Sequence, residues 1–245
     1  MHLDGGQRRG FFLTLEGPEG SGKSTQAQRL AARLAAAGYR CTVTREPGGT
    51  LLGEEVRRIL LHDMSPSPAA DALLFNAARA QLAAEVIEPA LARGEVVICD
   101  RFSDSTLAYQ GYGAGQALDA LRELARFAVG ALVPDLTVLI DLPVEEGLRR
   151  KLGGPDITRF ESSADLSFHR RVRDGFLALA EAEPDRFLVF DGRQPADSIE
   201  AAIAEALMSR LARRDGLRQS NTERGADSSR TALSEPERAS LRMDK

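Results

Sequence analysis

The segment Gly17-Pro-Glu-Gly-Ser-Gly22-Lys23-Ser24 constrains the fold of this chain more than any other feature. It matches the pattern G-x-x-x-x-G-K-[ST], follows an apolar run at residues 11–16 and precedes a stretch of helical periodicity. Glycines let successive backbone N–H groups turn inward around an anion, and the N-terminus of the next helix adds positive charge. The sequence therefore predicts a strand, a phosphate-binding loop and a helix, in that order.

Different residues of the loop are expected to contact different parts of a bound triphosphate. Lys23 is expected to reach the β- and γ-phosphates of ATP, and Ser24 to ligate Mg²⁺. Lysine occurs only at positions 23, 151 and 245. The alternative is a chance glycine-rich turn, which average residue frequencies would produce in roughly one chain in a hundred of this length. The residues expected to bind ATP are Gly17, Pro18, Glu19, Gly20, Ser21, Gly22, Lys23, Ser24 and Thr25.

Short apolar runs alternate with helical segments along the chain. The runs lie at residues 11–16, 41–45, 95–100, 136–141 and 186–191, and the helical segments at 23–37, 53–61, 69–92, 117–129, 144–151, 165–182 and 198–213. This alternation indicates βαβ units around a parallel sheet. We expect an α/β fold, a P-loop NTPase three-layer αβα sandwich with a five-stranded parallel sheet.

Composition suggests one globular domain with short extensions. We expect residues 1–10 to be an N-terminal extension, residues 11–213 to form the domain, and residues 214–245 to be a disordered tail, because that tail has few large apolar side chains. The net charge is −4 and the charges alternate, which does not indicate a broad nucleic-acid surface. No run resembles a signal peptide or a membrane span, so we expect a cytoplasmic protein.

The phosphate loop alone does not separate kinases from GTPases, motor ATPases or transporters, because all of them need it. A GTPase would be expected to carry a base-reading N-K-x-D segment. No lysine lies between Lys23 and Lys151, and Lys151 is followed by Leu-Gly. The residues that would bind the acceptor of the phosphate must therefore distinguish these classes of protein.

Three further segments supply that side: Thr44-Arg-Glu-Pro-Gly-Gly-Thr50, Asp100-Arg101-Phe102 and Ser105-Thr-Leu-Ala-Tyr-Gln-Gly111. Asp100 closes an apolar run beside the phosphate loop, so its carboxylate can hold Mg²⁺ directly or through water. Arg101 offers a planar fork suited to an acceptor phosphate. The alternative for this adjacent pair is a surface salt bridge.

Together with the phosphate loop, these segments resemble bacterial thymidylate kinase from about residue 11 to residue 207. The resemblance implies an enzyme that phosphorylates dTMP to dTDP using ATP and Mg²⁺, and a homodimer formed through helices beside the acceptor site, with residues 69–92 as a candidate. It also implies small-molecule partners alone, with no membrane and no nucleic acid.

The resemblance further assigns roles on the acceptor side. Phe75 would stack on the thymine ring and Arg79 would read its polar edge, and their spacing of four lets one helical face present both. Tyr109 would disfavour a ribose 2′-hydroxyl. The residues expected to bind dTMP are Glu19, Glu46, Pro47, Phe75, Arg79, Arg101, Ser105, Thr106, Tyr109 and Gln110, and those expected to bind the metal are Ser24 and Asp100.

Residues 148–161 occupy the place of the lid that closes over ATP. Relatives with glycine at the position of Gly20 usually carry a catalytic arginine in this lid, often within R-x-R-x-R-G. This chain has Leu152 and Gly154 where two of those arginines would align, which leaves the cations Arg149, Arg150, Lys151 and Arg159. We expect Lys23, Arg101, Arg149 and Arg150 to be catalytic. The alternative for the basic cluster is a solvated helix end favoured by the helix dipole.

Three other functions stay open at the level of sequence. A kinase for another pyrimidine monophosphate or for a deoxynucleoside would use the same phosphate loop. A regulatory nucleotide-binding protein would bind ATP without transferring phosphate, and the altered lid permits this. Nucleic-acid binding through the arginine-rich tail would depend strongly on salt.

Overall fold

The computed structural model describes residues 10–63, 66–152 and 165–231. The predicted lid residues Gly154 and Arg159 lie outside these ranges. The chain divides into two compact units, Met1–Ala204 and Glu205–Lys245. The sheet and the candidate site both belong to the first unit.

Five parallel strands form one sheet in the order β2-β3-β1-β4-β5. Their bounds are β1 Phe11–Glu16, β2 Cys41–Arg45, β3 Val96–Asp100, β4 Leu136–Asp141 and β5 Phe187–Asp191. Buried on both faces, the inner strands read as continuous apolar runs, and this made them recognisable. The predicted five-stranded parallel sheet is confirmed, although β3 and β5 each begin one residue later than predicted.

Helical elements connect the strands. They are α1 Lys23–Ala36, α2 Leu51–Arg58, α3 Pro68–Leu82, α4 Glu88–Ala92, α5 Ser103–Thr106, α6 Leu118–Val129, α7 Val144–Leu152, α9 Leu166–Ala182 and α10 Ala196–Thr231, with π-helical segments η1 Ile59–Asp63, η2 Ala83–Ile87 and η3 Leu107–Gly113. The predicted helix at residues 69–92 is thus a continuous run of α3, η2 and α4.

Two predictions from the sequence differ from the structure. The helical run α5 and η3 was not predicted, because its Ser, Thr and Gly residues have low helix propensity and tertiary packing overrides that preference. Helix α10 continues to Thr231, whereas we expected disorder from residue 214. Arginine, leucine, glutamate and glutamine favour helix in residues 214–224 although they supply no sustained apolar face. Residues 232–245 lie outside the described part of the chain.

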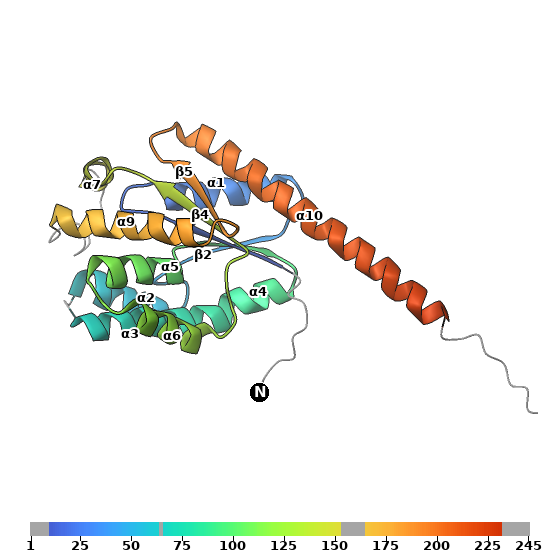
Figure 1. Cartoon of the computed structure of the whole chain (residues 1–245), viewed down its shortest axis with the longest axis horizontal. Coiled ribbons are helices and arrows are strands. Elements are labelled where there is room, and N and C mark those ends of the chain that lie inside the picture. Colours follow the sequence, from blue (N-terminus) through green and yellow to red (C-terminus); the bar gives the residue numbers. More distant parts are fainter. Residues whose placement is uncertain (1–9, 64–65, 153–164, 232–245) are drawn as a thin grey trace, which may run out of the picture. The chain divides into compact units, whose positions relative to one another are not determined.

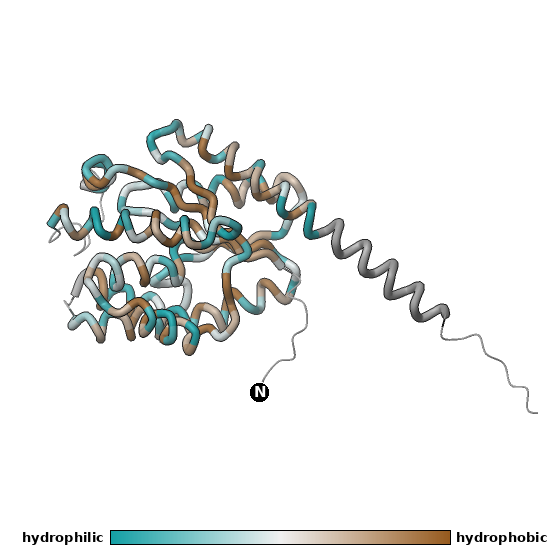
Figure 2. Tube along the Cα trace, viewed as in Figure 1, coloured by the Kyte–Doolittle hydropathy of each residue, from teal (hydrophilic) through white to brown (hydrophobic). Residues whose placement is uncertain are grey.

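Helices cover both faces of the sheet (Figure 1). Helix α1 contacts β1, β2 and β3 on one face, while α4 packs on β3 and α9 packs on β4 and β5 on the other. Hydrophobic residues concentrate along the strands between these layers (Figure 2). In the part of the chain that the structure describes, no helix combines the length and the apolar character needed to cross a bilayer.

The sheet face that α9 covers carries buried polar residues as well as apolar ones. Thr14 and Thr137 hydrogen-bond across β1 and β4 at 2.9 Å. Asp104 accepts hydrogen bonds of 2.6 and 3.0 Å from both terminal nitrogens of Arg186. Buried polar groups are tolerated only when they are paired in this way. This network lies toward the amino ends of β4 and β5, because Thr137 is the second residue of β4 and Arg186 directly precedes β5.

Candidate active site

The loop between β1 and α1 adopts the geometry that its glycines permit. Gly17 has φ 142° and Gly22 has φ 94°, in the region that favours glycine. The Lys23 ammonium folds back over the loop and donates to the carbonyls of Gly17 and Pro18 at 3.1 and 2.9 Å. Burial and the neighbouring Arg101 lower the pKa of Lys23 to about 8. An anion bound in the loop would favour the charged ammonium again.

The loop also touches helix α7 backbone to backbone. A Cβ on Gly20 would stand 2.1 Å from the carbonyl oxygen of Gly147, and a Cβ on Gly147 would stand 2.1 Å from the carbonyl oxygen of Glu19. Any larger side chain at either position requires the two segments to separate. The contact fixes α7 beside the phosphate loop.

A cleft of about 360 Å³ opens at the carboxyl edge of the sheet. Its walls come from the phosphate loop, the β2–α2 connection, α3, the β3–α5 connection, η3 and α7. The predicted site residues that line it are Glu19, Gly20, Ser21, Gly22, Lys23, Ser24, Thr25, Glu46, Pro47, Phe75, Arg79, Asp100, Arg101, Ser105, Thr106, Tyr109 and Gln110. Gly17 and Pro18 are not in the lining and meet the site through the carbonyls that accept from Lys23.

Arg101 joins the two halves of the cleft. One terminal nitrogen donates to Glu19 at 2.9 Å, and the other donates to the Gly17 carbonyl and the Ser105 hydroxyl at 3.2 and 3.0 Å. The Tyr109 hydroxyl donates to Glu19 at 2.7 Å. Burial acts to raise the pKa of Glu19, but the charges of Arg101 and Lys23 outweigh it and lower that pKa to about 2. Glu19 is therefore ionised at neutral pH.

Arg101 is the only described residue other than glycine with a positive φ, at 71°. Such a conformation costs free energy, of order 1 kcal/mol or more, and persists only where surrounding contacts determine it. Glu16 supplies two of these contacts, because its carboxylate accepts from the Phe102 amide at 2.8 Å and from the Ser105 hydroxyl at 2.6 Å. Burial and the nearby Asp104 carboxylate raise the pKa of Glu16 to about 8.

Arg79 and Glu46 form a buried pair on the acceptor side. The Arg79 Nε donates to Glu46 Oε2 at 2.8 Å, and the terminal nitrogens of Arg79 donate to Asn76 and Thr106 at 3.0 and 2.8 Å. Burial raises the pKa of Glu46 to about 7, against the opposing charge of Arg79. The second oxygen, Oε1, has no hydrogen-bond partner among the described residues. Phe75, one helical turn before Arg79, forms the apolar wall of the cleft beside this pair.

Ser24 and Asp100, the two predicted metal ligands, lie together. The Ser24 hydroxyl donates to Asp100 Oδ2 at 2.5 Å, at the junction of the phosphate loop and β3. Both supply the hard oxygen atoms that Mg²⁺ prefers, and Mg²⁺ in nucleotide sites takes few protein ligands because phosphates and waters fill the rest of its shell. The residues present therefore fit a magnesium ion held largely by the bound nucleotide.

The three basic residues at the end of helix α7 differ in whether they line the cleft. Lys151 lines the cleft, and its charge contributes to lowering the pKa of Glu19. Arg149 and Arg150, which the sequence predicted to be catalytic, are not in the lining. Arg150 instead pairs with Glu146 and donates to the Gly192 carbonyl at 3.0 Å.

The sequence did not single out every residue of the cleft. Arg45, Arg57, Leu61 and Phe102 also line it. Arg45 stands within the Thr44–Thr50 segment, but nothing in its spacing distinguishes it from a surface charge. Arg57 lies on α2 and donates to the Pro47 carbonyl at 3.0 Å. This contact exists only in the folded chain, so the spacing of the sequence does not reveal it.

A parallel α/β sheet, a phosphate loop and a second, polar half-cleft joined to it define the class of P-loop nucleotide kinases. The family model for thymidylate kinase matches residues 15–203. This chain belongs to the thymidylate kinase family, as its sequence motifs indicated.

Named relatives agree with this assignment. The thymidylate kinase of Deinococcus radiodurans is 55% identical over 205 residues, which cover 82% of this chain and 98% of the relative. That of Thermomicrobium roseum is 52% identical over 202 residues, covering 80% and 96%. The crystal structure of thymidylate kinase from Ehrlichia chaffeensis aligns with a TM-score of 0.67 at 35% identity, covering 81% of this chain and 98% of that one.

The raised pKa of Glu16 predicts a measurable dependence of stability on pH. The folded state holds this proton up to about pH 8, whereas the unfolded chain releases it near the usual value of 4.5. The contribution of Glu16 to the free energy of unfolding is therefore complete below pH 4.5 and is lost as the pH rises to about 8. We expect Glu16→Gln to gain stability relative to the unmodified protein as the pH rises from 5 to 8, in urea unfolding without nucleotide.

Glu123→Gln is the matched control, because Glu123 is exposed on α6. Its stability difference from the unmodified protein is expected to stay constant over the same range. A constant difference for Glu16→Gln as well would contradict the assignment of a raised pKa to Glu16.

Proposed function

We propose that the cleft binds Mg²⁺ and ATP against the phosphate loop and dTMP against α3 and η3, so that the γ-phosphate passes between them. The chain is an ATP-dependent kinase that phosphorylates dTMP to dTDP. The observation that carries the proposal is the Arg101–Glu19 pair, which joins a phosphate-binding loop to a polar half-cleft that contains the Arg79–Glu46 pair.

On the donor side, Gly17 to Thr25 hold the triphosphate, with Lys23 on the β- and γ-phosphates. Ser24 and Asp100 would hold a magnesium ion, which would supply positive charge to neutralise the phosphates. On the acceptor side, Phe75 stacks on the base and Arg79 donates to its polar edge, while Thr106 and Gln110 complete the base contacts. Glu46, Pro47 and Tyr109 surround the sugar, and Tyr109 leaves no room for a 2′-hydroxyl.

The transfer itself needs no side-chain base. An oxygen of the dTMP phosphate attacks the γ-phosphorus in line, the bond from that phosphorus to the β–γ bridging oxygen breaks, and ADP leaves with the electron pair. The attacking phosphate is already anionic at neutral pH. The protein therefore contributes positioning and positive charge, through Lys23 and Arg101, while Ser105 and Glu19 orient the Arg101 guanidinium.

Helix α7 supplies further positive charge to the transferring phosphate. The contact of Gly147 with Gly20 holds the helix against the phosphate loop, and Lys151 lies one turn further on the same face, in the lining of the cleft. Among Arg149, Arg150 and Lys151, we therefore assign the main role to Lys151.

The lid assignment is tested by comparing Lys151→Met with Arg149→Met. We expect kcat to fall about a hundredfold for Lys151→Met, the usual effect of removing one group that stabilises transition-state charge. Arg149→Met, the matched control from the exposed side of α7, is expected to retain kcat within about threefold. The reverse order would show that Arg149 carries the role predicted from the sequence.

The function is tested by measuring ADP formation from ATP and Mg²⁺ with dTMP, dUMP, UMP, dCMP or thymidine as acceptor. We expect a strong preference for dTMP. Lys23→Ala should abolish turnover without changing the circular dichroism spectrum, because it removes a cation from the transferring phosphate and buries no new group. Turnover near the unmodified rate in this variant would refute the mechanism, and ATP binding without turnover on any acceptor would favour a regulatory protein.

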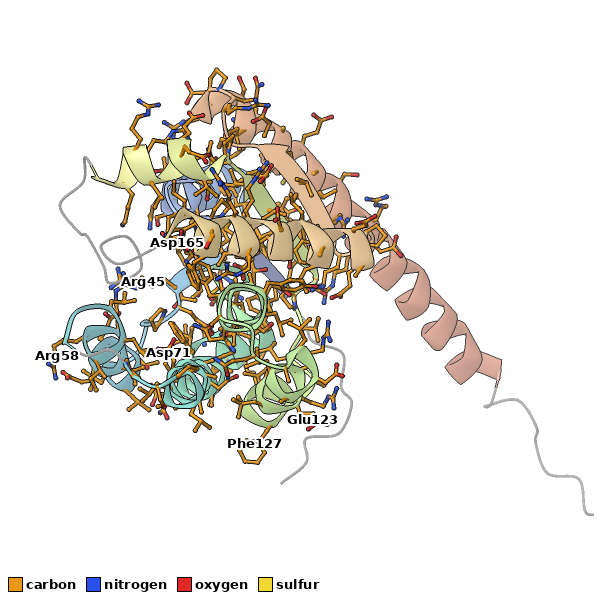
Figure 3. The ribbon with its side chains drawn as sticks, turned by 60° about the vertical axis from the view of Figure 1, so that its left-hand side comes forward. Arg45, Arg58, Asp71, Glu123, Phe127 and Asp165 are labelled. Atoms are coloured by element: carbon orange, nitrogen blue, oxygen red, sulfur yellow. The ribbon has the colours of Figure 1, made fainter. Side chains whose placement is uncertain are left out.

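A homodimer is the proposed assembly, formed through the helices beside the acceptor site. The large apolar side chains Leu73 on α3 and Phe127 on α6 are 57% and 90% exposed, and Phe127 points away from the ribbon (Figure 3). Helices α3 and α6 pack on each other, so one partner surface can cover both side chains. We expect this enzyme to work in the cytoplasm, the compartment that holds ATP and nucleotide precursors.

The dimer is tested by light scattering after size-exclusion chromatography. We expect twice the protomer mass for the unmodified protein and the protomer mass for Phe127→Asp, since a charge at the centre of an apolar interface is costly. Leu166→Asp is the control, because Leu166 is an exposed apolar residue at the start of α9. A dimer that withstands both Phe127→Asp and Leu73→Asp would place the interface elsewhere.

A further inference from the structure

Gln110 is a buried amide in the wall of the cleft. It belongs to η3 and is 3% exposed. Its Nε2 donates to Oδ2 of Asp71 at 3.1 Å, and Asp71 is itself 7% exposed. Asp71 lies on α3 (Figure 3). It is not among the residues that line the cleft. The hydrogen bond to Gln110 therefore links Asp71 to the wall of the cleft.

The chemistry of Asp71 allows only one orientation of the Gln110 amide. An ionised carboxylate accepts hydrogen bonds and donates none, so it requires the NH₂ group of the amide. A flipped amide would place its oxygen against the Asp71 oxygen, with two acceptors facing each other. The acceptor atom of Gln110, Oε1, is consequently turned away from Asp71.

We propose that Asp71 is a positioning residue that sets base specificity, by holding the Gln110 amide with its acceptor toward the bound base. Thymine and uracil present an N–H donor at ring position 3, whereas cytosine presents an acceptor there. A hydrogen-bond acceptor that the protein holds in place therefore binds thymine and uracil and repels cytosine. The inference rests on the proposed function, in which the base lies against Gln110.

Arg79 reinforces the same selection. It lies on α3 two helical turns after Asp71, lines the cleft, and can only donate hydrogen bonds. The 4-carbonyl of thymine or uracil accepts from such a group, and the 4-amino group of cytosine does not. A buried polar group left without its hydrogen-bond partner costs free energy. A site that combines the Gln110 acceptor with the Arg79 donor therefore discriminates strongly between thymine or uracil and cytosine.

The assignment is tested by the acceptor specificity of Asp71→Asn, measured as kcat/KM for dTMP, dCMP and dUMP. Asparagine can donate or accept, so it lets the Gln110 amide rotate. We expect the dTMP-to-dCMP ratio to fall at least tenfold, chiefly through a lower KM for dCMP. The dTMP-to-dUMP ratio is expected to stay within twofold, because both bases carry the N–H at position 3.

Three comparisons separate positioning from loss of structure. Asp71→Asn in a Gln110→Ala background should change the dTMP-to-dCMP ratio less than twofold, because the amide through which Asp71 acts is gone. Asp119→Asn, at an exposed aspartate of α6, is the matched control and should leave all three acceptors unchanged. Asp71→Ser, whose hydroxyl also donates and accepts, should reproduce the relaxed specificity if the asparagine variant does not fold.

Two results would overturn the inference. One is an unchanged dTMP-to-dCMP ratio in a folded Asp71 variant, and the other is an equal fall of the dTMP-to-dUMP ratio. An unmodified protein that does not phosphorylate dTMP would instead refute the proposed function of the cleft.

Discussion

The buried guanidinium of Arg101 is the interaction on which the site depends. It contacts the phosphate loop through Gly17 and Glu19 and the acceptor side through Ser105 and Tyr109, so the two half-sites share one rigid group. Charge and hydrogen bonds hold it in place although its backbone is strained at φ 71°. Because these contacts come from three different elements, the phosphate loop, α5 and η3, none of them can shift without disturbing the hydrogen bonds that join the two halves of the cleft. The contacts that join the two halves of the cleft are therefore also the ones that maintain the strained backbone of Arg101.

Most of the fold and much of the cleft could be predicted from the sequence, for a physical reason. Inner strands buried on both faces are continuous apolar runs, and the glycines of the phosphate loop stand where the backbone must turn inward. Seventeen predicted residues line the cleft. Most of them belong to motifs that follow β1, β2 and β3, where topology alone brings them together, whereas Phe75 and Arg79 lie within α3. Local sequence was enough wherever a strand end determined the position.

The residues that sequence reasoning missed or misplaced depend on contacts between distant segments. Glu16 reads as the last residue of a buried strand, and its two hydrogen bonds to the β3–α5 connection exist only after the sheet has formed. Asp71 reads as an acidic residue in a helix first turn. Arg149 and Lys151 cannot be ranked by spacing, because the rotation of α7 against the phosphate loop decides which of them faces the cleft. The sequence predicted disorder from residue 214 because little apolar surface can be buried there, whereas residues that favour helix let α10 continue to Thr231.

The contact between Gly20 and Gly147 has a consequence for how this enzyme can move. Because no side chain separates the two backbones, we expect the first turn of α7 and the phosphate loop to move together as one rigid unit. Any movement of α7 relative to the phosphate loop must therefore begin C-terminal to Gly147, within the turn that carries Lys151. Lys151 would then sit beside the pivot, where an angular movement displaces it least, so its ammonium would stay in the wall of the cleft while more distal residues move.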